Sequence, residues 1–236
     1  MKLWKKIKLF RKVLLRFSKD IIHGQYFKFA TKSDDISAFN HSISINQEIK
    51  KNETYESKMY NFSLAAKKIN EVVIYPNEIF SFWKIIGNPN YQFQKGRTIQ
   101  NGEIVEDVGG GLCQVSGIIY YVSLIGGLEI LERYNHSTDI YNDETRFCPL
   151  GTDATIVYGY KDLRMQNNFD FPIKFHIEIA DQLIAIKLLS TKPLIENELS
   201  FEMNEHEDHT SVIIKNKLDK VLNKSIYKKL IKSKAT

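Results

Sequence analysis

One cysteine directly follows a run of glycines, in the stretch GGGLCQVS at residues 109–116. Three glycines let the backbone turn sharply and approach a ligand closely. If a helix begins near Leu112, Cys113 lies in its first turn, where free N–H groups and the positive end of the helix dipole favour thiolate over thiol. The same N–H groups could hold an oxyanion. The structural alternative is a small buried cysteine packed beneath a glycine turn.

A histidine and an aspartate follow in an order that suits a nucleophilic cysteine, which needs a base and a group that orients the base. His136 lies 23 residues after Cys113, and Asp153 lies 17 residues after His136. A cysteine at a helix start and two polar residues on later strands can converge where a helix packs on a sheet. We therefore predict a group of Cys113, His136 and Asp153 that would serve acyl or amide transfer. The alternatives are a polar strand-end residue for His136 and an acid that caps a bend for Asp153.

Other chemistries have weaker support in the sequence. A zinc site made of Cys113, Cys148, His136 and Asp153 is conceivable, but no CxxC or HExxH spacing supports it, and we expect no metal and no cofactor. Cys148 precedes Pro149 in an expected loop, where no chemical role is predicted for it. The chain has no glycine-rich phosphate-binding motif, so nucleotide binding is not indicated.

The elements that must position these residues indicate an α+β fold. One helix is expected over residues 57–70, and a second, largely buried one from Leu112 to the glycines at 126–127. Residues 31–56 are polar and suggest an extended lead-in. Strands are expected at 72–76, 79–83, 128–134, 136–141, 154–159, 163–167, 173–180 and 183–189, with a hairpin that turns at Asn101-Gly102. Because strands outnumber helices without a βαβα order, we predict a mostly antiparallel sheet packed by the buried helix after the triple-glycine turn.

Composition and charge narrow the class of protein. The chain has 236 residues, of which 43% are hydrophobic and 26% are charged, as in ordinary soluble globular proteins. Two cysteines are too few for a disulfide scaffold, so a reducing compartment is expected. The net charge of +5 is uneven, with +8 over residues 1–19, +7 over residues 215–236 and −10 between them. An acidic middle repels phosphate, which excludes a nucleic-acid-binding core.

Both basic ends show helical periodicity. The apolar residues of the first one recur every three or four positions, at Leu3, Ile7, Phe10, Leu14 and Phe17. Lys and Arg lie mostly on the other side, so this helix suits either the headgroup layer of an anionic membrane or a docked position on its own domain. The last residues give a second basic helix, with either a membrane role or a solvated one.

We divide the chain accordingly into three segments. They are a basic amphipathic helical segment (1–30), an α+β domain (57–190), and an acidic connection with a basic C-terminal helix (191–236). No apolar run reaches the roughly 20 residues of a membrane span or the roughly 7 to 15 of a signal-peptide core. We therefore expect a cytoplasmic protein that can lie peripherally on the inner membrane face.

Several stretches together resemble the VanW family, named for an accessory member of vancomycin-resistance gene clusters. The resemblance covers about residues 60–180 and includes YNFSLAAKKIN, YPNEIFSFWKIIG, GGGLCQVS, ERYNHS and GTDATIVYGYKDLRMQNN. The chain is similar to the short type of this family, which is without a transmembrane anchor or a G5 domain. The family's elements map here onto Gly109, Gly110, Gly111, Cys113, Gln114, Ser116, His136 and Asp153. The resemblance implies a bacterial protein linked to glycopeptide resistance or cell-wall metabolism, and it implies no particular reaction.

Two functions remain open from the sequence. In the first, Cys113 is the nucleophile, His136 the general base and Asp153 its orienter in a thiol enzyme that acts on a peptide-like peptidoglycan precursor. The groups that would bind the ligand or oxyanion are then Gly109, Gly110, Gly111, Gln114 and Ser116. In the second, a non-catalytic module binds a carboxylate or phosphate at the glycine turn and attaches to the inner membrane surface through its basic ends.

Overall fold

A largely buried helix, α4 (Leu112–Ile125), follows the triple-glycine turn, as the sequence predicts. The computed structural model describes residues 3–35, 37–100, 103–139 and 148–229. Along this helix Val115, Ile118, Ile119 and Val122 are almost fully buried, because nearly all its faces meet protein. The remaining helices are α1 (Leu3–Ile22), α2 (Tyr55–Asn70) and α3 (Phe82–Ile86), with short 3-10 turns η1 (Tyr26–Lys28) and η2 (Pro89–Tyr91).

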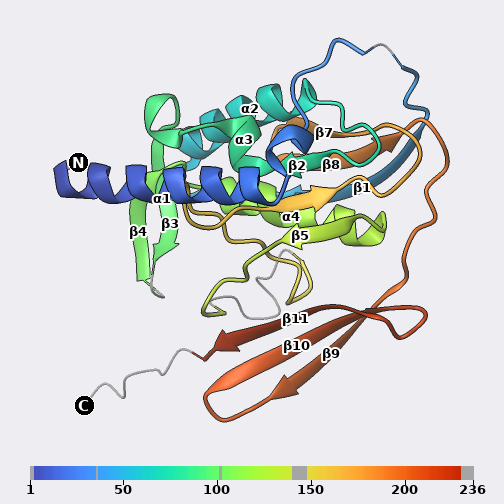
Figure 1. The fold of residues 1–236 in the computed structure, drawn as a ribbon. Helices are drawn as coiled ribbons and strands as arrows, with labels where there is room; N and C mark the ends of the chain where they lie inside the picture. The colour runs from blue at the N-terminus through green and yellow to red at the C-terminus, as the bar shows by residue number, and fades with distance from the viewer. Residues whose placement is uncertain (1–2, 36, 101–102, 140–147, 230–236) are drawn as a thin grey trace.

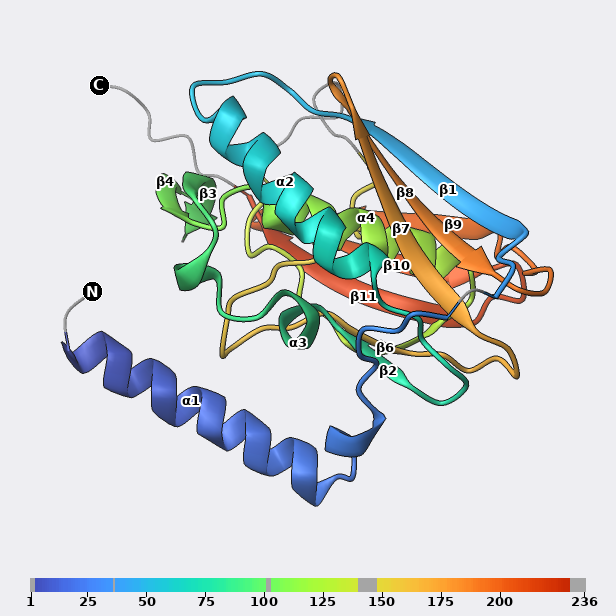
Figure 2. The same ribbon diagram turned by 90° about the horizontal axis from the view of Figure 1, so that it is seen from above.

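The main sheet has the order β1-β8-β7, and all its neighbouring strands are antiparallel. Its strands are β1 (His41–Glu48), β7 (Ile173–Ala180) and β8 (Leu183–Ser190). Alternate residues face the core: Phe175 and Ile177 on β7, and Ile184, Ile186 and Leu188 on β8, are buried. Helices α2 and α4 pack on this sheet, as Figure 2 shows from above. The observed helices and antiparallel sheets confirm the α+β class.

Smaller sheets surround α4 on its other sides. One has the order β2-β6-β5 and the other is the hairpin β3-β4, and both are antiparallel. Their strands are β2 (Ile79–Ser81), β3 (Lys95–Gln100), β4 (Glu103–Val108), β5 (Glu129–Glu132) and β6 (Arg164–Gln166). The hairpin occurs where the sequence predicts it, although its turn at Asn101-Gly102 lies outside the described residues.

The C-terminal part forms a fourth sheet, so the prediction of a basic C-terminal helix is wrong. Strands β9 (Leu199–Glu205), β10 (His209–Asn216) and β11 (Val221–Lys228) pair in the order β11-β10-β9. Asp219 turns the chain between β10 and β11 with a φ of 57°. Burial then alternates with a period of two, since Ser225 and Tyr227 are buried while Lys224 and Ile226 are exposed. Figure 1 shows this sheet below the body, with its strands side by side.

Three other expectations about strands also need correction. The expected lead-in at 31–56 contains β1, whose Ile43 and Gln47 are buried beside β8. Residues 154–159 form no strand, because their backbone groups pair singly: Thr155 N donates to the Tyr134 carbonyl, and the Ala154 carbonyl accepts from the Ser116 hydroxyl. The described part of 136–141, residues 136–139, forms only an isolated bridge at Thr138.

Helix α1 is present as predicted and lies along one side of the body (Figures 1 and 2). Its inner side is tied to the β2-β6-β5 region, where Arg16 pairs with Glu132 and Asp20 pairs with Arg164. In the described part of the chain, no helix combines the length and the apolar content needed to cross a bilayer.

Candidate functional site

The triple-glycine turn sets the start of α4, and Cys113 lies in the first helical turn. Gly111 is the N-cap residue and has a left-handed φ of 91°, and Gly109 has a φ of 81°. A side chain is disfavoured at such angles. The Cys113 side chain is partly exposed, and its Sγ lies 4.0 Å from the carbonyl oxygen of Ile156. The sulfur is therefore at the edge of the core rather than sealed beneath the turn.

The middle glycine of the turn packs backbone to backbone on strand β3. A Cβ placed on Gly110 would lie 2.2 Å from the carbonyl carbon of Gly96, a distance that backbone atoms cannot accommodate. The fully buried Asn61 of α2 holds the same contact, because its Nδ2 donates to the carbonyls of Gln94 and Gly110, each at 3.0 Å. The turn is thus a rigid support for the start of α4. Asn61 was missed by the sequence reasoning, although a polar residue on the apolar face of a helix signals such a role.

His136 and Asp153 form the second part of the site, and both lie on loops instead of the expected strands. Asp153 Oδ2 accepts from the backbone N–H of His136 at 2.7 Å and lies 2.6 Å from His136 Nδ1. The Cys113 side chain also interacts with the His136 ring and favours its protonated form. The structure therefore brings together the three residues that the sequence analysis selected.

Charges in this group reinforce one another. Burial opposes protonation of His136, but its hydrogen bonds to Asp153 and Cys113 and their charges outweigh burial and raise the pKa of His136 to about 10. Burial also opposes ionisation of Asp153, but the His136 hydrogen bond and the Arg133 charge lower the pKa of Asp153 to about 2. Each of the two side chains is 27% exposed. At neutral pH the pair is an imidazolium beside a carboxylate.

A buried arginine supports Asp153 from behind. The Arg133 side chain is only 5% exposed. Its Nε donates to the Asp153 carbonyl at 2.7 Å, and its Nη2 donates to the Gly151 carbonyl at 2.8 Å and to Asp153 Oδ1 at 2.9 Å. Its guanidinium also lies over the ring of Tyr120, 4.9 Å from the ring centre. Arg133 lies in the ERYNHS stretch. The sequence signal for its supporting role was a single cationic residue beside an apolar strand.

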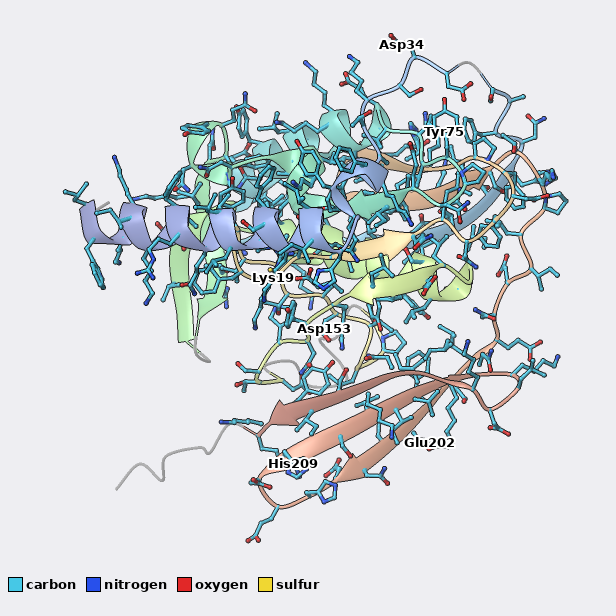
Figure 3. The ribbon with its side chains drawn as sticks, in the orientation of Figure 1. Lys19, Asp34, Tyr75, Asp153, Glu202 and His209 are labelled. Atoms are coloured by element: carbon cyan, nitrogen blue, oxygen red, sulfur yellow. The ribbon has the colours of Figure 1, made fainter. Side chains whose placement is uncertain are left out.

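Strand β11 supplies the last partners of this support. The Tyr227 hydroxyl donates to Asp153 Oδ1, and the Ser225 hydroxyl accepts from Arg133 Nη1 at 2.6 Å. Figure 3 shows Asp153 between the body and the C-terminal sheet. No sequence signal pointed to Tyr227, because the segment that carries it was predicted to be helical.

Gln114 and Ser116, predicted to contact a ligand, have different positions. Gln114 is half-buried, and its Nε2 donates to Gln47 Oε1 at 3.2 Å. Ser116 is fully buried, and its hydroxyl donates to the Ala154 carbonyl at 2.7 Å. Ser116 thus connects α4 to the loop after Asp153, behind the sulfur. Its observed contacts are those of a structural residue.

The second cysteine lies near this site in a different environment. Burial raises the pKa of Cys148 to about 11, although hydrogen bonds from Thr152 and Gln47 oppose the shift. Its thiol is therefore protonated at neutral pH and suits a control in reactivity experiments. Among the described residues, no group of three or more His, Cys, Asp or Glu side chains is arranged to hold a metal ion.

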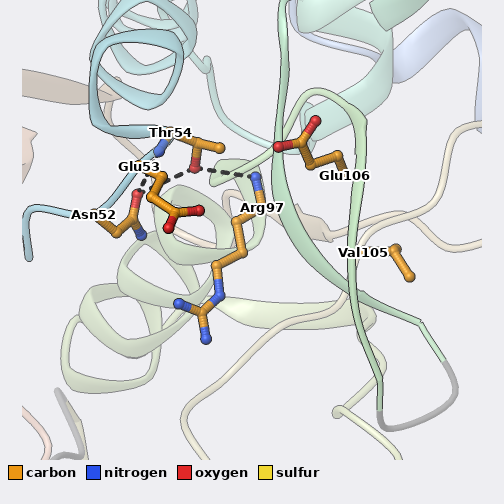
Figure 4. Close-up of a pocket in the computed structure, with 6 residues that line it drawn as sticks. All are labelled: Asn52, Glu53, Thr54, Arg97, Val105 and Glu106. Atoms are coloured by element: carbon orange, nitrogen blue, oxygen red, sulfur yellow. Dashed lines mark hydrogen bonds between the residues drawn. The ribbon is translucent and has the colours of Figure 1, made fainter.

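An open groove adjoins the glycine turn. Its volume is about 430 Å³, and it lies between the loop before α2 and the β3-β4 hairpin (Figure 4). Its lining residues are Asn52, Glu53, Thr54, Arg97, Val105 and Glu106. Arg97 follows Gly96, the residue on which Gly110 packs.

Lys58 connects the groove to the turn. A Cβ placed on Gly111 would lie 2.9 Å from Lys58 Cγ, so the Lys58 side chain passes directly beside the turn. Burial, and then the positive charge of Arg97, lower the pKa of Lys58 to about 8. Arg97 in the lining of the groove and Lys58 beside the turn are therefore neighbouring cations.

Comparisons with known proteins find matches over the middle of the chain. The family model for VanW-like proteins matches residues 57–189. Of the curated relatives, a protein named uncharacterized protein YoaR, from Bacillus subtilis (strain 168), is 38% identical over 142 residues, which are 59% of this chain and 45% of that protein. The vancomycin B-type resistance protein VanW of Enterococcus faecalis (strain ATCC 700802 / V583) is 30% identical over 169 residues, which are 71% of this chain and 58% of that protein.

The matched regions thus span about half the length of these curated relatives. No solved structure matches this chain significantly. The family match covers more than half of the chain, includes the glycine turn, Cys113, His136 and Asp153, and ends before β9. The chain therefore belongs to the family of VanW-like proteins.

Proposed function

We propose that this protein is a thiol-dependent enzyme that transfers or hydrolyses an acyl group on a peptide-like cell-wall precursor. The observation that carries the proposal is the His136 ring, which is hydrogen-bonded to Asp153 through Nδ1 and also interacts with the Cys113 side chain. A nucleophile, a proton-carrying group and an orienting carboxylate in this order form the usual arrangement for covalent catalysis by cysteine. Cys113 also lies in the first turn of α4, where free backbone N–H groups favour an anion.

The raised pKa of His136 determines the order of proton transfers. Since His136 is protonated at neutral pH, we assign the attacking form of the enzyme to a Cys113 thiolate beside an imidazolium. The thiolate attacks the substrate's carbonyl carbon and the C–N bond breaks, while His136 gives its proton to the leaving amine. A thioester to Cys113 and a neutral His136 remain. Water or a second amine then attacks the thioester, His136 takes its proton, and the thiolate leaves.

N–H groups at the start of α4 would stabilise the oxyanion formed in each attack. The N–H of Gln114 already bonds the Gly111 carbonyl at 2.8 Å, and the N–H of Leu112 bonds that of Gly109 at 3.1 Å. The N–H of Cys113 has no backbone bond of this kind to a described residue and is the candidate donor next to the sulfur. We therefore assign the oxyanion to the Cys113 N–H and to the positive end of α4 rather than to the side chains of Gln114 and Ser116.

The substrate class rests on similarity and on the groove. A relative at 30% identity is named a vancomycin B-type resistance protein, which supports a role of this chain in glycopeptide resistance or cell-wall metabolism. The lining of the groove offers Arg97 for a carboxylate and Glu53 and Glu106 for an ammonium group, and the charge of Lys58 lies close to Arg97. Peptides carry both groups, so a peptide segment suits this lining better than a purely anionic ligand.

The test is to trap the thioester. The full chain is mixed with cell-wall stem peptides, quenched in acid, and examined by intact-protein mass spectrometry. We expect an adduct on wild type and on Cys148→Ser, none on Cys113→Ser, and a strongly reduced yield on His136→Ala. Unchanged masses together with peptide binding that survives Cys113→Ser would contradict catalysis and favour the non-catalytic module instead.

A further inference from the structure

Helix α1 is fixed to the body by one side only. Arg16 makes two bonds to the Glu132 carboxylate, at 2.9 and 2.6 Å, and Arg164 makes two to Asp20, at 2.6 and 3.2 Å. Asp20 is 4% exposed, so this second pair is buried. Val13 and Leu9 lie about one turn and two turns before Arg16, and both approach Gly159. A Cβ placed on Gly159 would lie only 2.8 Å from Leu9 Cδ1. The helix therefore has a defined inner side and a defined outer side.

The outer side is apolar and uncovered. Trp4 is 71% exposed and Phe10 is 68% exposed, values far above those of core residues. The exposed large apolar residues of this helix are Leu3, Trp4, Ile7, Phe10, Leu14, Leu15, Phe17, Ile21 and Ile22. At 100° per residue, most of them lie away from the side that Leu9, Arg16 and Asp20 turn toward the body. A contiguous apolar surface of this kind marks an interaction site.

The charge of the helix identifies the kind of partner. Its basic residues without an ion pair to a described residue are Lys5, Lys6, Lys8, Arg11, Lys12 and Lys19, of which Lys12 lies over the ring of Tyr160. Its single acid, Asp20, is buried against Arg164. The exposed side of the helix is thus purely cationic and apolar. A protein partner would match the apolar strip alone, whereas an anionic lipid surface matches both features at once.

The position of the helix allows such a contact. Its N-terminal half projects beyond the hairpin β3-β4 in Figure 1 and stands at the side of the body in Figure 2. Trp4 lies in that half, and aromatic side chains with a polar atom prefer the boundary between headgroups and acyl chains. Lys and Arg side chains beside it can keep their charges among the phosphates.

We propose that α1, docked on the body by Arg16 and Asp20, binds the surface of an anionic membrane with its outer side while lying parallel to it. The helix is thus both docked and interfacial, which resolves the two alternatives left by its sequence pattern. This inference does not depend on the reaction proposed for Cys113, since no residue is shared between the two sites.

The test is sedimentation of the full chain with vesicles. Vesicles of phosphatidylglycerol and phosphatidylcholine in equal parts are compared with vesicles of phosphatidylcholine alone, at low and high salt. We expect binding to the anionic vesicles that weakens with salt. The double variants Trp4→Ser/Phe10→Ser and Lys5→Glu/Lys8→Glu should each reduce binding by about tenfold or more. Circular dichroism checks that both variants keep the fold.

Matched controls use exposed residues elsewhere. Ile195→Ser/Leu218→Ser removes side chains that are 91% and 85% exposed, and Lys220→Glu/Lys224→Glu reverses two exposed lysines near the C-terminus. Both controls should bind like wild type. Equal binding to neutral and anionic vesicles, equal loss in the controls, or no binding at all would overturn the proposal. A wild-type dimer in light scattering that Trp4→Ser/Phe10→Ser converts to a monomer would overturn it too, by assigning the apolar strip to a second copy.

Discussion

The hydroxyl of Tyr227 donates a hydrogen bond to the carboxylate of Asp153, although Tyr227 lies on strand β11 of the C-terminal sheet and Asp153 lies on a loop of the body. Asp153 Oδ1 accepts hydrogen bonds from Tyr227 and Arg133, while Oδ2 is hydrogen-bonded to the backbone and ring nitrogens of His136. Each carboxylate oxygen therefore has two hydrogen-bond partners. The plane of the carboxylate, and with it the ring of His136, is set by Arg133 inside the family match and by Tyr227 beyond its end.

Removing the Tyr227 hydroxyl should loosen this arrangement. Tyr227→Phe leaves the ring in place but takes one donor from Asp153, so we expect a loss of about 1 kcal/mol in the free energy of unfolding. Urea unfolding measures this loss. Tyr91→Phe, at a position 83% exposed, is the matched control and should have no effect. Equal stability of the two variants would show that the Tyr227 bond contributes nothing.

Removing the charge of Arg133 should be far more costly. Arg133→Met keeps much of the buried volume but leaves the carbonyls of Gly151 and Asp153 and the Asp153 carboxylate without their donor. Breaking a buried pair on one side costs about 3–5 kcal/mol, and unfolding by heat or urea reports the change. The exposed Arg97 provides the control Arg97→Met, for which we expect a change below about 0.5 kcal/mol. A mild effect of Arg133→Met would contradict its role in holding Asp153.

The glycine turn should reject even one methyl group at its centre. Gly110→Ala forces a Cβ to 2.2 Å from the carbonyl carbon of Gly96, so either the turn or strand β3 must move. Gly117→Ala is a sharp control, because its nearest new contact is 3.6 Å and it lies inside α4. We expect a loss of several kcal/mol for the first variant and a small gain, up to about 1 kcal/mol, for the second. Similar melting temperatures for both would refute the close packing.

Stability should depend on pH through Asp153 and His136 in opposite directions. The Asp153 pKa falls from 3.8 to about 2 on folding, so its contribution is complete above about pH 4 and is lost as pH falls through 2. The His136 pKa rises from 6.5 to about 10, so its contribution is complete below pH 6.5 and is lost as pH rises through 10. Each shift corresponds to on the order of 2 kcal/mol or more.

Urea unfolding of wild type, Asp153→Asn and His136→Gln across pH measures both effects. The stability difference between wild type and Asp153→Asn should shrink below pH 4, and the difference between wild type and His136→Gln should shrink above pH 6.5. Differences that stay constant across the range would mean that neither group changes its proton affinity on folding.

The elements with a strong local signal could be predicted from the sequence. Helical periodicity located α1, α2 and α4, and the alternation in FPIKFHIEI located β7. The C-terminal sheet could not be found in this way. Apolar residues in NKLDKVLNKSIYKKL fit a helical stripe as well as a strand, and the choice depends on pairing with β10, which local sequence does not encode.

The site was predicted in part for similar reasons. Cys113 has a local signature in its glycines, and the residue types of His136 and Asp153 fit a nucleophile's partners. The residues that hold them could not be predicted in this way, because Arg133, Tyr227 and Asn61 act through contacts between distant segments. Asn61 and Gly110 are 49 positions apart, and Tyr227 and Asp153 are 74 positions apart. Such contacts exist only in the folded chain.

The most direct test of the central claim is the rate at which iodoacetamide alkylates Cys113 as a function of pH, measured in the Cys148→Ser background. The account predicts that the wild type is alkylated faster at pH 6 than an ordinary exposed thiol. It also predicts that His136→Ala slows alkylation at pH 6 by about tenfold or more and moves the rise toward the ordinary thiol pKa of about 8.5. Identical profiles with and without His136, both rising near pH 8.5, would contradict the assignment of Cys113 as an activated nucleophile.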